Sequence, residues 1–524
     1  MPRSPLPLLF ALLVLLGSAV AQDDPARADA LREFQKQWKK FKEEPQMVEA
    51  VMTLKGQETP AAGEELLKLL KHPSALVQQA ALAVLESYRE PATFQPWIDA
   101  MPKLKDQEQL ALLVKVLGRA KQKGAVPVIE AAAADPKASS VLRYEAARAF
   151  AQIGEGGSAG LFAGFLQDKE PQVRLAALDT ITTLKKKEHA AATVQALQDP
   201  EWHVQTAAVA AVGVLRVQDA IQPLIDKLKE AGRLQIECAD SLFKITAVDN
   251  GVDAERWQTW WNQCKQITGW RIPTDEELVK KAENRKKYDA LYGKVGEGKT
   301  NAFAGIPTTS TNVLFIIDVS GSMDDLVVER EKFQGYRDLK RFTIVQTELL
   351  NTLDSLTPDT NFDILAFATD IDPWKKRLVQ ANVVNREAAK SWVRALRPLG
   401  GSEAQGLAGV GLGGAANLQA GKTNTLKALL YPFGIDPEKP QPKPTITGFD
   451  KNATKSPLDT VYFLSDGKPS VGKLVETKEI LREVLRCNEA YRIVFHAIAI
   501  GDFQKDFLQE LARDTGGVFV DLGR

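Results

Sequence analysis

Apolar residues recur at helical spacing through the first half of the chain. Segments in residues 46–265 place leucine, valine and alanine three or four positions apart after a proline or polar turn, beginning at Pro73, Ser139, Pro171, Pro200 and Leu234. This spacing is typical of amphipathic helices. The segments recur at roughly 30–35 residues, the size of a two-helix solenoid unit. Because such a unit cannot bury its apolar face alone, the pattern predicts a stacked α-helical solenoid.

The pattern changes at residue 312. From there to residue 524, apolar strands alternate with amphipathic helices, and the strands read VLFIID, FDILAFA, TVYFLSDG, IVFHAIAIG and GVFVDL. Continuous apolar runs are typical of strands buried on both faces of a parallel sheet. The sequence therefore predicts a multidomain chain, in which an all-α solenoid precedes a doubly wound α/β domain with a mostly parallel central sheet.

Length and charge fit this organisation. The chain has 524 residues, too many for a single core, and carries 67 basic and 67 acidic side chains. A balanced charge gives no argument for nucleic acid as a partner. We expect a signal peptide at 1–21, an N-terminal helical segment at 22–45, the solenoid at 46–265, a linker at 266–311 and the α/β domain at 312–524.

The signal peptide is predicted from Arg3, the apolar run that follows it, and the small residues that end in Ala21. No later stretch has about 18 consecutive apolar residues, so we expect no transmembrane segment in the mature chain. The protein is therefore expected to be exported to the periplasm or the extracellular space.

Residues 293–300 read GKVGEGKT, the letters of a phosphate loop. Such a loop needs a buried strand before it and a helix after it. Here the preceding segment is polar and helical, and Gly305 and Pro307 interrupt the following one. We therefore interpret this segment as part of the linker. His496 lies in the middle of a predicted strand, and no arrangement of serine, histidine and aspartate is visible, so we expect the protein not to be an enzyme.

The strand VLFIID ends at Asp318, and Ser320 and Ser322 follow it in a glycine-containing loop. Asp466 follows another strand, in FLSDG. Ligands of parallel sheets bind at the carboxyl ends of the strands. Magnesium prefers about six oxygen ligands and keeps some of its waters. Two carboxylates would neutralise a divalent ion and the hydroxyls would add ligands without charge, so the pattern predicts a divalent cation site.

These residues resemble the metal-ion-dependent adhesion site of a von Willebrand factor type A (VWA) domain, whose motif joins D-x-S-x-S to a distant threonine and a distant aspartate. The order of strands and helices in 312–524 resembles that domain throughout. The resemblance implies a metal site formed by Asp318, Ser320, Ser322, Thr423 and Asp466. It also implies Mg²⁺, or Mn²⁺ or Ca²⁺, and a protein partner that offers an acidic side chain to the ion.

The third loop of this site has two candidates. Thr423 lies in GKTNTLKAL, which fits the threonine loop of the family. The chain departs from the family pattern by inserting residues 400–420 before it, and Ser402 in this insertion is the rival candidate. A second insertion, at 432–457, separates the threonine loop from the strand that ends at Asp466.

The segment PQVRLAALDTITTL, with Arg174, Ala176 and Ala177, resembles a HEAT-type repeat, while Gln205 stands where the arginine would be. The whole layout resembles exported bacterial proteins that join HEAT repeats to a VWA domain. We therefore expect an adhesion-type protein-binding module, with the solenoid as scaffold or second interaction surface. The alternative is a metal-dependent hydrolase that uses the same site, for which the sequence shows no positioned base.

Overall fold

The computed structural model describes residues 25–522 except 231, 293–300, 329, 401–420, 440–448, 451 and 502–504. Contacts divide the chain into two compact units, Met1–Leu215 with Gln441–Phe449, and Arg216–Pro440 with Asp450–Arg524. Within the described ranges, no helix combines the length and apolarity needed to cross a membrane. The predicted signal peptide, the segment 293–300 and Ser402 lie outside the described residues.

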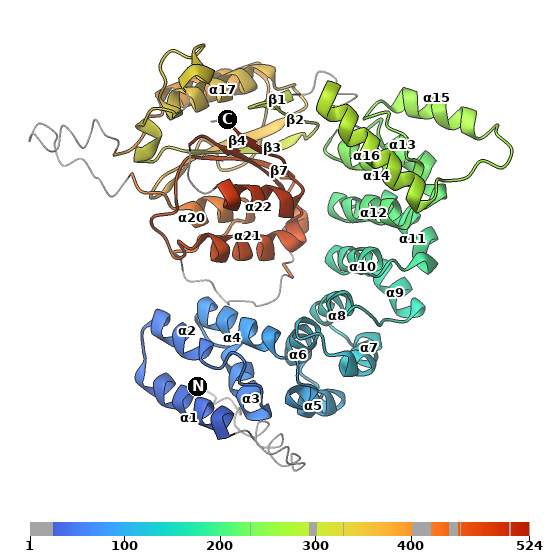
Figure 1. The fold of residues 1–524 in the computed structure, drawn as a ribbon, viewed down its shortest axis with the longest axis vertical. Coiled ribbons are helices and arrows are strands. Elements are labelled where there is room, and N and C mark those ends of the chain that lie inside the picture. Colours follow the sequence, from blue (N-terminus) through green and yellow to red (C-terminus); the bar gives the residue numbers. More distant parts are fainter. Residues whose placement is uncertain are drawn as a thin grey trace, which may run out of the picture. The chain divides into compact units, whose positions relative to one another are not determined.

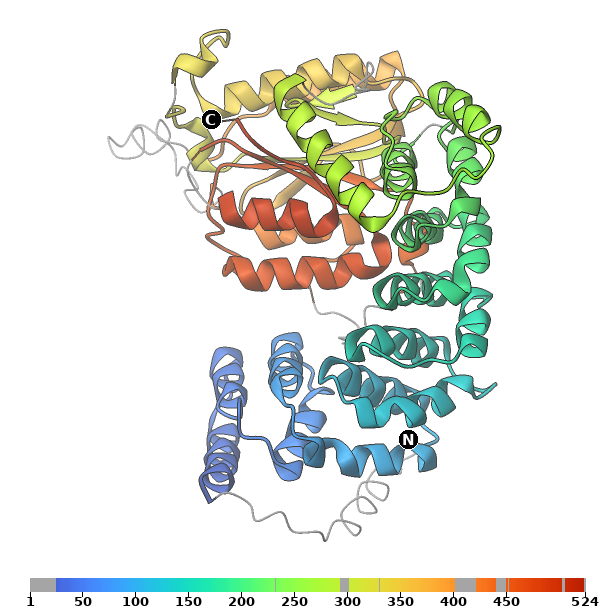
Figure 2. The ribbon, with the colours of Figure 1, turned by 45° about the vertical axis from the view of Figure 1, so that its right-hand side comes forward.

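The first unit is α-helical, and α6, α8, α10 and α12 pack against one another in succession (Figure 2). Its helices are α1 (Pro25–Lys40), α2 (Glu44–Met52), α3 (Pro60–Leu69), α4 (Ala75–Ser87), α5 (Pro91–Ala100), α6 (Gln107–Arg119), α7 (Val126–Ala134), α8 (Ser140–Ile153), α9 (Ala159–Leu166), α10 (Pro171–Leu184), α11 (Ala190–Gln195) and α12 (Trp202–Leu215). Serine side chains cap α4 and α8 by accepting backbone N–H groups, which explains why these helices begin where they do. The predicted helical N-terminal region is confirmed.

An arginine and a glutamine side chain tie α10 and α12 to the turns before them. Arg174 in α10 donates to the backbone oxygen of Asp168 at 2.8 Å and pairs with the Asp199 carboxylate at 2.7 Å. Gln205 in α12 donates to the backbone oxygen of Asp199 at 2.6 Å, also six residues back. Gln205 stands where the repeat pattern has an arginine. It makes the same hydrogen bond to the backbone oxygen six residues earlier, but it cannot form the ion pair that Arg174 forms.

The second unit is built around a mixed sheet with the order β5-β4-β3-β7-β8-β9, and β6 also pairs with β4. Strands β4, β3, β7, β8 and β9 are parallel, whereas β5 and β6 run antiparallel to β4. The strands of the sheet are β3 (Asn312–Asp318), β4 (Asn361–Phe367), β5 (Ile371–Pro373), β6 (Val379–Gln380), β7 (Thr460–Ser465), β8 (Val494–Ala499) and β9 (Phe519–Asp521). The predicted α/β domain with a mostly parallel sheet is confirmed.

Helices cover both faces of this sheet, with α17 on one side and α20, α21 and α22 on the other (Figure 1). The helices after β3 are α17 (Arg341–Ser355), α18 (Val383–Ala395), α20 (Thr425–Leu430), α21 (Thr477–Tyr491) and α22 (Lys505–Thr515). Helix α17 begins at Arg341, and the residues before it are not part of the helix. Backbone pairing of Leu326 with Lys340, together with the Asp338 carboxylate that accepts the Lys340 N–H at 3.0 Å, holds the preceding residues in a turn.

The second unit also contains α13 (Ile221–Lys227), α14 (Leu234–Thr246), α15 (Ala254–Cys264), α16 (Asp275–Tyr292) and the hairpin β1 (Asn301–Phe303) and β2 (Ile306–Thr308). Phe303 of the hairpin packs edge-on against Phe315 of β3 and Tyr462 of β7, whose rings stack at 5.5 Å. The end of the predicted linker is therefore part of the core of this unit.

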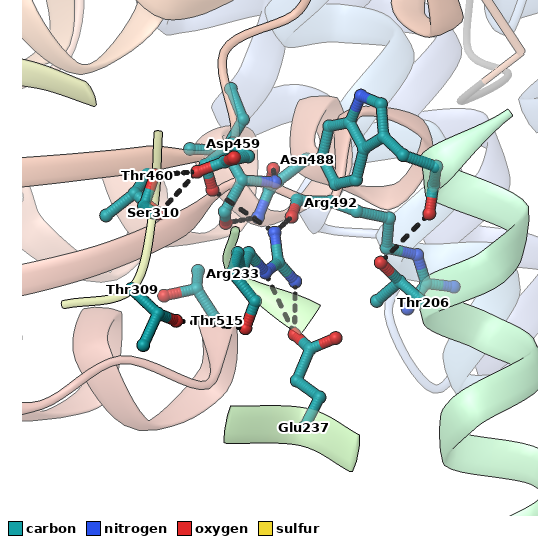
Figure 3. Close-up of polar contacts among 12 residues, drawn as sticks. Thr206, Arg233, Glu237, Thr309, Ser310, Asp459, Thr460, Asn488, Arg492 and Thr515 are labelled. Atoms are coloured by element: carbon teal, nitrogen blue, oxygen red, sulfur yellow. Dashed lines mark hydrogen bonds and ion pairs between the residues drawn. The ribbon is translucent and has the colours of Figure 1, made fainter. Parts of the chain in front are cut away.

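Arg233, immediately before α14, contacts the edge of the sheet at which β7 and β8 begin (Figure 3). Its guanidinium donates to the backbone oxygen of Asp459 at 3.1 Å and to that of Arg492, and it pairs with Glu237 at 2.7 Å. Asp459 is itself buried, and its carboxylate accepts hydroxyl hydrogens from Ser310 and Thr460. These polar contacts, the Arg233 junction, join α14 to the amino-terminal ends of β7 and β8, at the opposite end of the strands from Asp318 and Asp466.

Candidate metal centre

Two adjacent parallel strands deliver the carboxylates. Asp318 ends β3 and Asp466 follows β7, and the two strands pair with Ile317 opposite Leu464. The chain runs from β3 to β4 on one side and then to β7, β8 and β9 on the other, so the strand order reverses between β3 and β7. Ligands of open α/β sheets bind at such a reversal, outside the carboxyl ends of the strands.

The loop after β3 folds its serines back toward these carboxylates. Asp318 Oδ1 accepts the Ser320 N–H at 2.8 Å, the two serine Oγ atoms lie 3.2 Å apart, and Ser322 Oγ donates to Asp466 Oδ1 at 2.9 Å. Gly321 has no space for a side chain, because a Cβ there would lie 2.8 Å from the Gly400 carbonyl oxygen. The glycine between the serines is therefore required by packing.

The third loop is fastened to the loop after β7. The Thr423 N–H donates to Ser470 Oγ at 2.9 Å, and the Ser470 N–H donates to the Thr423 carbonyl at 2.9 Å. On the other side, the Asn424 N–H donates to the Ala368 carbonyl at 2.8 Å, beside the end of β4. These backbone bonds fix Thr423, which is buried, at the same end of the sheet as the two carboxylates.

Gly467 marks the point on which the side-chain oxygens converge. A Cβ built on this glycine would lie 3.2 Å from Thr423 Oγ1 and 3.6 Å from both Asp318 Oδ2 and Ser322 Oγ. Ser320 and Asp466 contact Ser322 directly. The structure therefore brings all five residues of the predicted site together.

This donor set fits a hard divalent cation, because it consists of two carboxylates and three hydroxyls around a space that a side chain would fill. Within the described residues, this centre included, no group of three or more His, Cys, Asp or Glu side chains is placed to hold a metal ion. The centre contains two carboxylates, and its other side-chain oxygens are the hydroxyls of Ser320, Ser322 and Thr423.

Burial and mutual repulsion act on the two carboxyls. Burial raises the pKa of Asp318, and the neighbouring Asp466 carboxylate raises it further, although hydrogen bonds from Ser320 and Ser465 oppose the change. Burial also raises the pKa of Asp466. The raised pKa values mean that the ionised forms of these two buried carboxyls are unfavourable by themselves. A cation between them would stabilise the ionised forms.

Arg341 is the residue of this site that sequence reasoning missed. Its Nη1 donates to Asp466 Oδ2 at 2.6 Å, and its side chain is 9% exposed. Arg341 lies 19 residues after Ser322, and nothing in the intervening sequence indicates that the two approach each other.

His496 is engaged elsewhere in the core. Its Nδ1 accepts the Val518 N–H at 3.0 Å, and its ring stacks on Tyr462 with centroids 4.8 Å apart. Burial lowers its pKa to about 4. The imidazole is therefore neutral at physiological pH and joins β8 to the segment before β9.

Comparison with known proteins agrees with this architecture. Residues 158–242 match HEAT repeats, and residues 337–410 and 443–521 match the von Willebrand factor type A domain. The chain thus carries HEAT repeats followed by a VWA domain. The matched ranges include Asp466 but not the other four residues of the candidate site.

The chain is similar to inter-alpha-trypsin inhibitor heavy chain H1 of Mesocricetus auratus, with 26% identity over 209 residues, 40% of this chain and 18% of that protein. It is also similar to heavy chain H4 of Homo sapiens, with 25% identity over 215 residues, 41% of this chain and 18% of that protein. It therefore spans about a fifth of the length of these curated relatives, 18% in both cases. Among solved structures, the von Willebrand factor type A protein from Catenulispora acidiphila is 19% identical, with a TM-score of 0.27 over 41% of this chain and 39% of that one.

Proposed function

We propose that the VWA domain holds a divalent cation, Mg²⁺ or else Mn²⁺ or Ca²⁺, and uses it to bind an acidic side chain of a protein partner. VWA domains commonly mediate protein interactions. The observation that carries the proposal is the convergence of Thr423, Asp318 and Ser322 oxygens on Gly467. In the same proposal the chain is exported, is not an enzyme, and uses its HEAT repeats as scaffold or second interaction surface.

The ion would be held by Asp318, Ser320, Ser322, Thr423 and Asp466. A bound divalent cation supplies an open coordination position that a carboxylate oxygen can take. The chain's own contribution is to keep the charge of the site low. Three of the five oxygen-bearing side chains are neutral hydroxyls, so the negative charge of the five does not exceed the positive charge of the ion.

Isothermal titration of Mg²⁺ into the wild-type chain and into Asp318→Ala and Thr423→Ala tests the cation site. We expect saturable binding in the wild type, at least about tenfold weaker binding in Thr423→Ala, and none in Asp318→Ala, because each change removes an oxygen from the cluster. Thr425→Ala is the matched control, since Thr425 is equally buried and lies two residues further along. It should bind Mg²⁺ like the wild type.

The result that would overturn the cation site is equal binding by the wild type and Asp318→Ala. The partner chemistry is tested by titrating a glutamate-containing peptide with and without Mg²⁺. Binding that needs the ion supports capture of an acidic side chain. Mg²⁺-dependent hydrolysis of the peptide by the wild type, absent in Asp318→Ala, would instead support the hydrolase alternative.

A further inference from the structure

Arg341 places a fixed positive charge inside the candidate metal centre. Its guanidinium is bonded to one oxygen of Asp466, while the other oxygen of the same carboxylate accepts the Ser322 hydroxyl. The Asp466 side chain is fully buried and that of Arg341 nearly so. An ion pair shielded from water in this way acts on its surroundings more strongly than a surface pair.

The backbone around Arg341 fixes the position of this charge. The Arg341 N–H donates to the Asp325 carbonyl at 3.0 Å, which ties the start of α17 to the loop after Ser322. Gly501, beyond the end of β8, lies over the guanidinium, since a Cβ on this glycine would be 3.4 Å from Arg341 Cζ. Its φ of +136° also disfavours any other residue there. The position of the Arg341 guanidinium is therefore fixed by the backbone on both sides of the site.

Arg341 changes the net charge of the site. With Asp318 and Asp466 ionised, Arg341 brings the net charge to −1, and a divalent cation brings it to +1. A carboxylate from a ligand then makes the assembly neutral. Without the arginine, the cation alone would neutralise the two aspartates, and a ligand carboxylate would create an uncompensated negative charge in a buried site, which is unfavourable.

We propose that Arg341 couples the cation to the acidic ligand: it weakens binding of the cation alone and strengthens binding of the cation together with a carboxylate. Arg341 is thus a positioning and charge-setting residue of the centre. This inference rests on the proposed function of the site. It adds that the ion and the acidic ligand each strengthen the binding of the other.

Mg²⁺ titrations into the wild type, Arg341→Met and Arg341→Lys test this coupling, each in sodium chloride and in sodium acetate of equal ionic strength. Acetate serves as the carboxylate probe. In chloride, Arg341→Met should bind Mg²⁺ about tenfold more tightly than the wild type, because a nearby positive charge has been removed. Acetate should tighten Mg²⁺ binding in the wild type and in Arg341→Lys, which keeps the charge, but not in Arg341→Met.

Arg341→Gln provides a second neutral variant if the methionine variant does not fold. Unchanged or weaker Mg²⁺ binding in the neutral variants, or an equal effect of acetate in all variants, would overturn the role of Arg341 while leaving the cation site intact. Absence of Mg²⁺ binding in the wild type would instead overturn the proposed function, and the coupling with it.

Discussion

Asp363 is a buried carboxyl that the candidate site does not use. It lies within β4, is 2% exposed, and accepts the N–H groups of Ile364 at 2.8 Å and Lys375 at 2.9 Å. Burial raises its pKa to about 7, and the two hydrogen bonds only partly oppose this effect. A single aspartate in the sheet therefore makes the stability of the domain depend on pH near neutrality.

The sign of this dependence follows from the raised pKa. The folded state binds the proton of Asp363 more tightly than the unfolded state, so the stabilisation is complete below about pH 4 and is lost as the pH rises through about 7. We expect Asp363→Asn to raise the free energy of unfolding by about 1–3 kcal/mol at pH 8, with no gain near pH 4. Urea unfolding of both proteins at several pH values measures the difference.

Asp372→Asn, at an exposed position in β5, is the control and should leave the pH dependence unchanged. A gain in Asp363→Asn that is the same at every pH would argue against titration of this carboxyl as the cause.

At the scale of elements, strands were easier to predict than loops. Both β3 and β7 are buried on two faces, so their apolar runs ended visibly at Asp318 and next to Asp466. The third loop depends instead on backbone bonds to Ser470 and Ala368, which are distant in sequence. The predicted choice of Thr423 fits its convergence with the other oxygens, whereas Ser402, the rival, lies outside the described residues.

The pairing of the Thr423 and Ser470 loops predicts an effect outside the oxygen cluster. Ser470→Ala removes the acceptor of the Thr423 N–H and should weaken Mg²⁺ binding about threefold to tenfold, because it loosens Thr423, a proposed ligand, without removing its oxygen. The thermal midpoint should change little, since Ser470 is exposed. Ser355→Ala, an exposed serine at the end of α17, should alter neither quantity. Wild-type Mg²⁺ affinity in Ser470→Ala would show that Thr423 is positioned by other contacts.

At the scale of the whole molecule, sequence periodicity separated the helical repeats from the α/β domain but showed nothing of the junction at Arg233. Its contacts join residues 226 and 259 positions apart, and a lone arginine at the start of a helix resembles any solvent-exposed one. The boundaries 46–265, 266–311 and 312–524 stay predictions. The contacts themselves group α13–α16 with the α/β domain.

Replacing Arg233 by methionine should destabilise the second unit. The partly buried carbonyls of Asp459 and Arg492 would lose a charged donor, so we expect a loss of about 1–3 kcal/mol in the free energy of unfolding. Arg271→Met is the matched control, because Arg271 also pairs with a glutamate but is 61% exposed, and its loss should cost less than about 0.5 kcal/mol. Equal effects in urea unfolding of the two variants would mean that the junction contributes no more than a surface ion pair.

The junction at Arg233 also determines which segment of the chain would have to accompany the α/β domain if it were fused to another protein. A VWA domain cut at residue 312 would leave behind the guanidinium that donates to the backbone just before β7 and β8, and it would lose the Phe303 ring that packs beside Phe315. A graft of this domain onto another protein would therefore have to carry α13–α16 and the β1–β2 hairpin with it. In recombination between genes, we expect α13–α16 to be inherited with the VWA domain rather than with the preceding repeats.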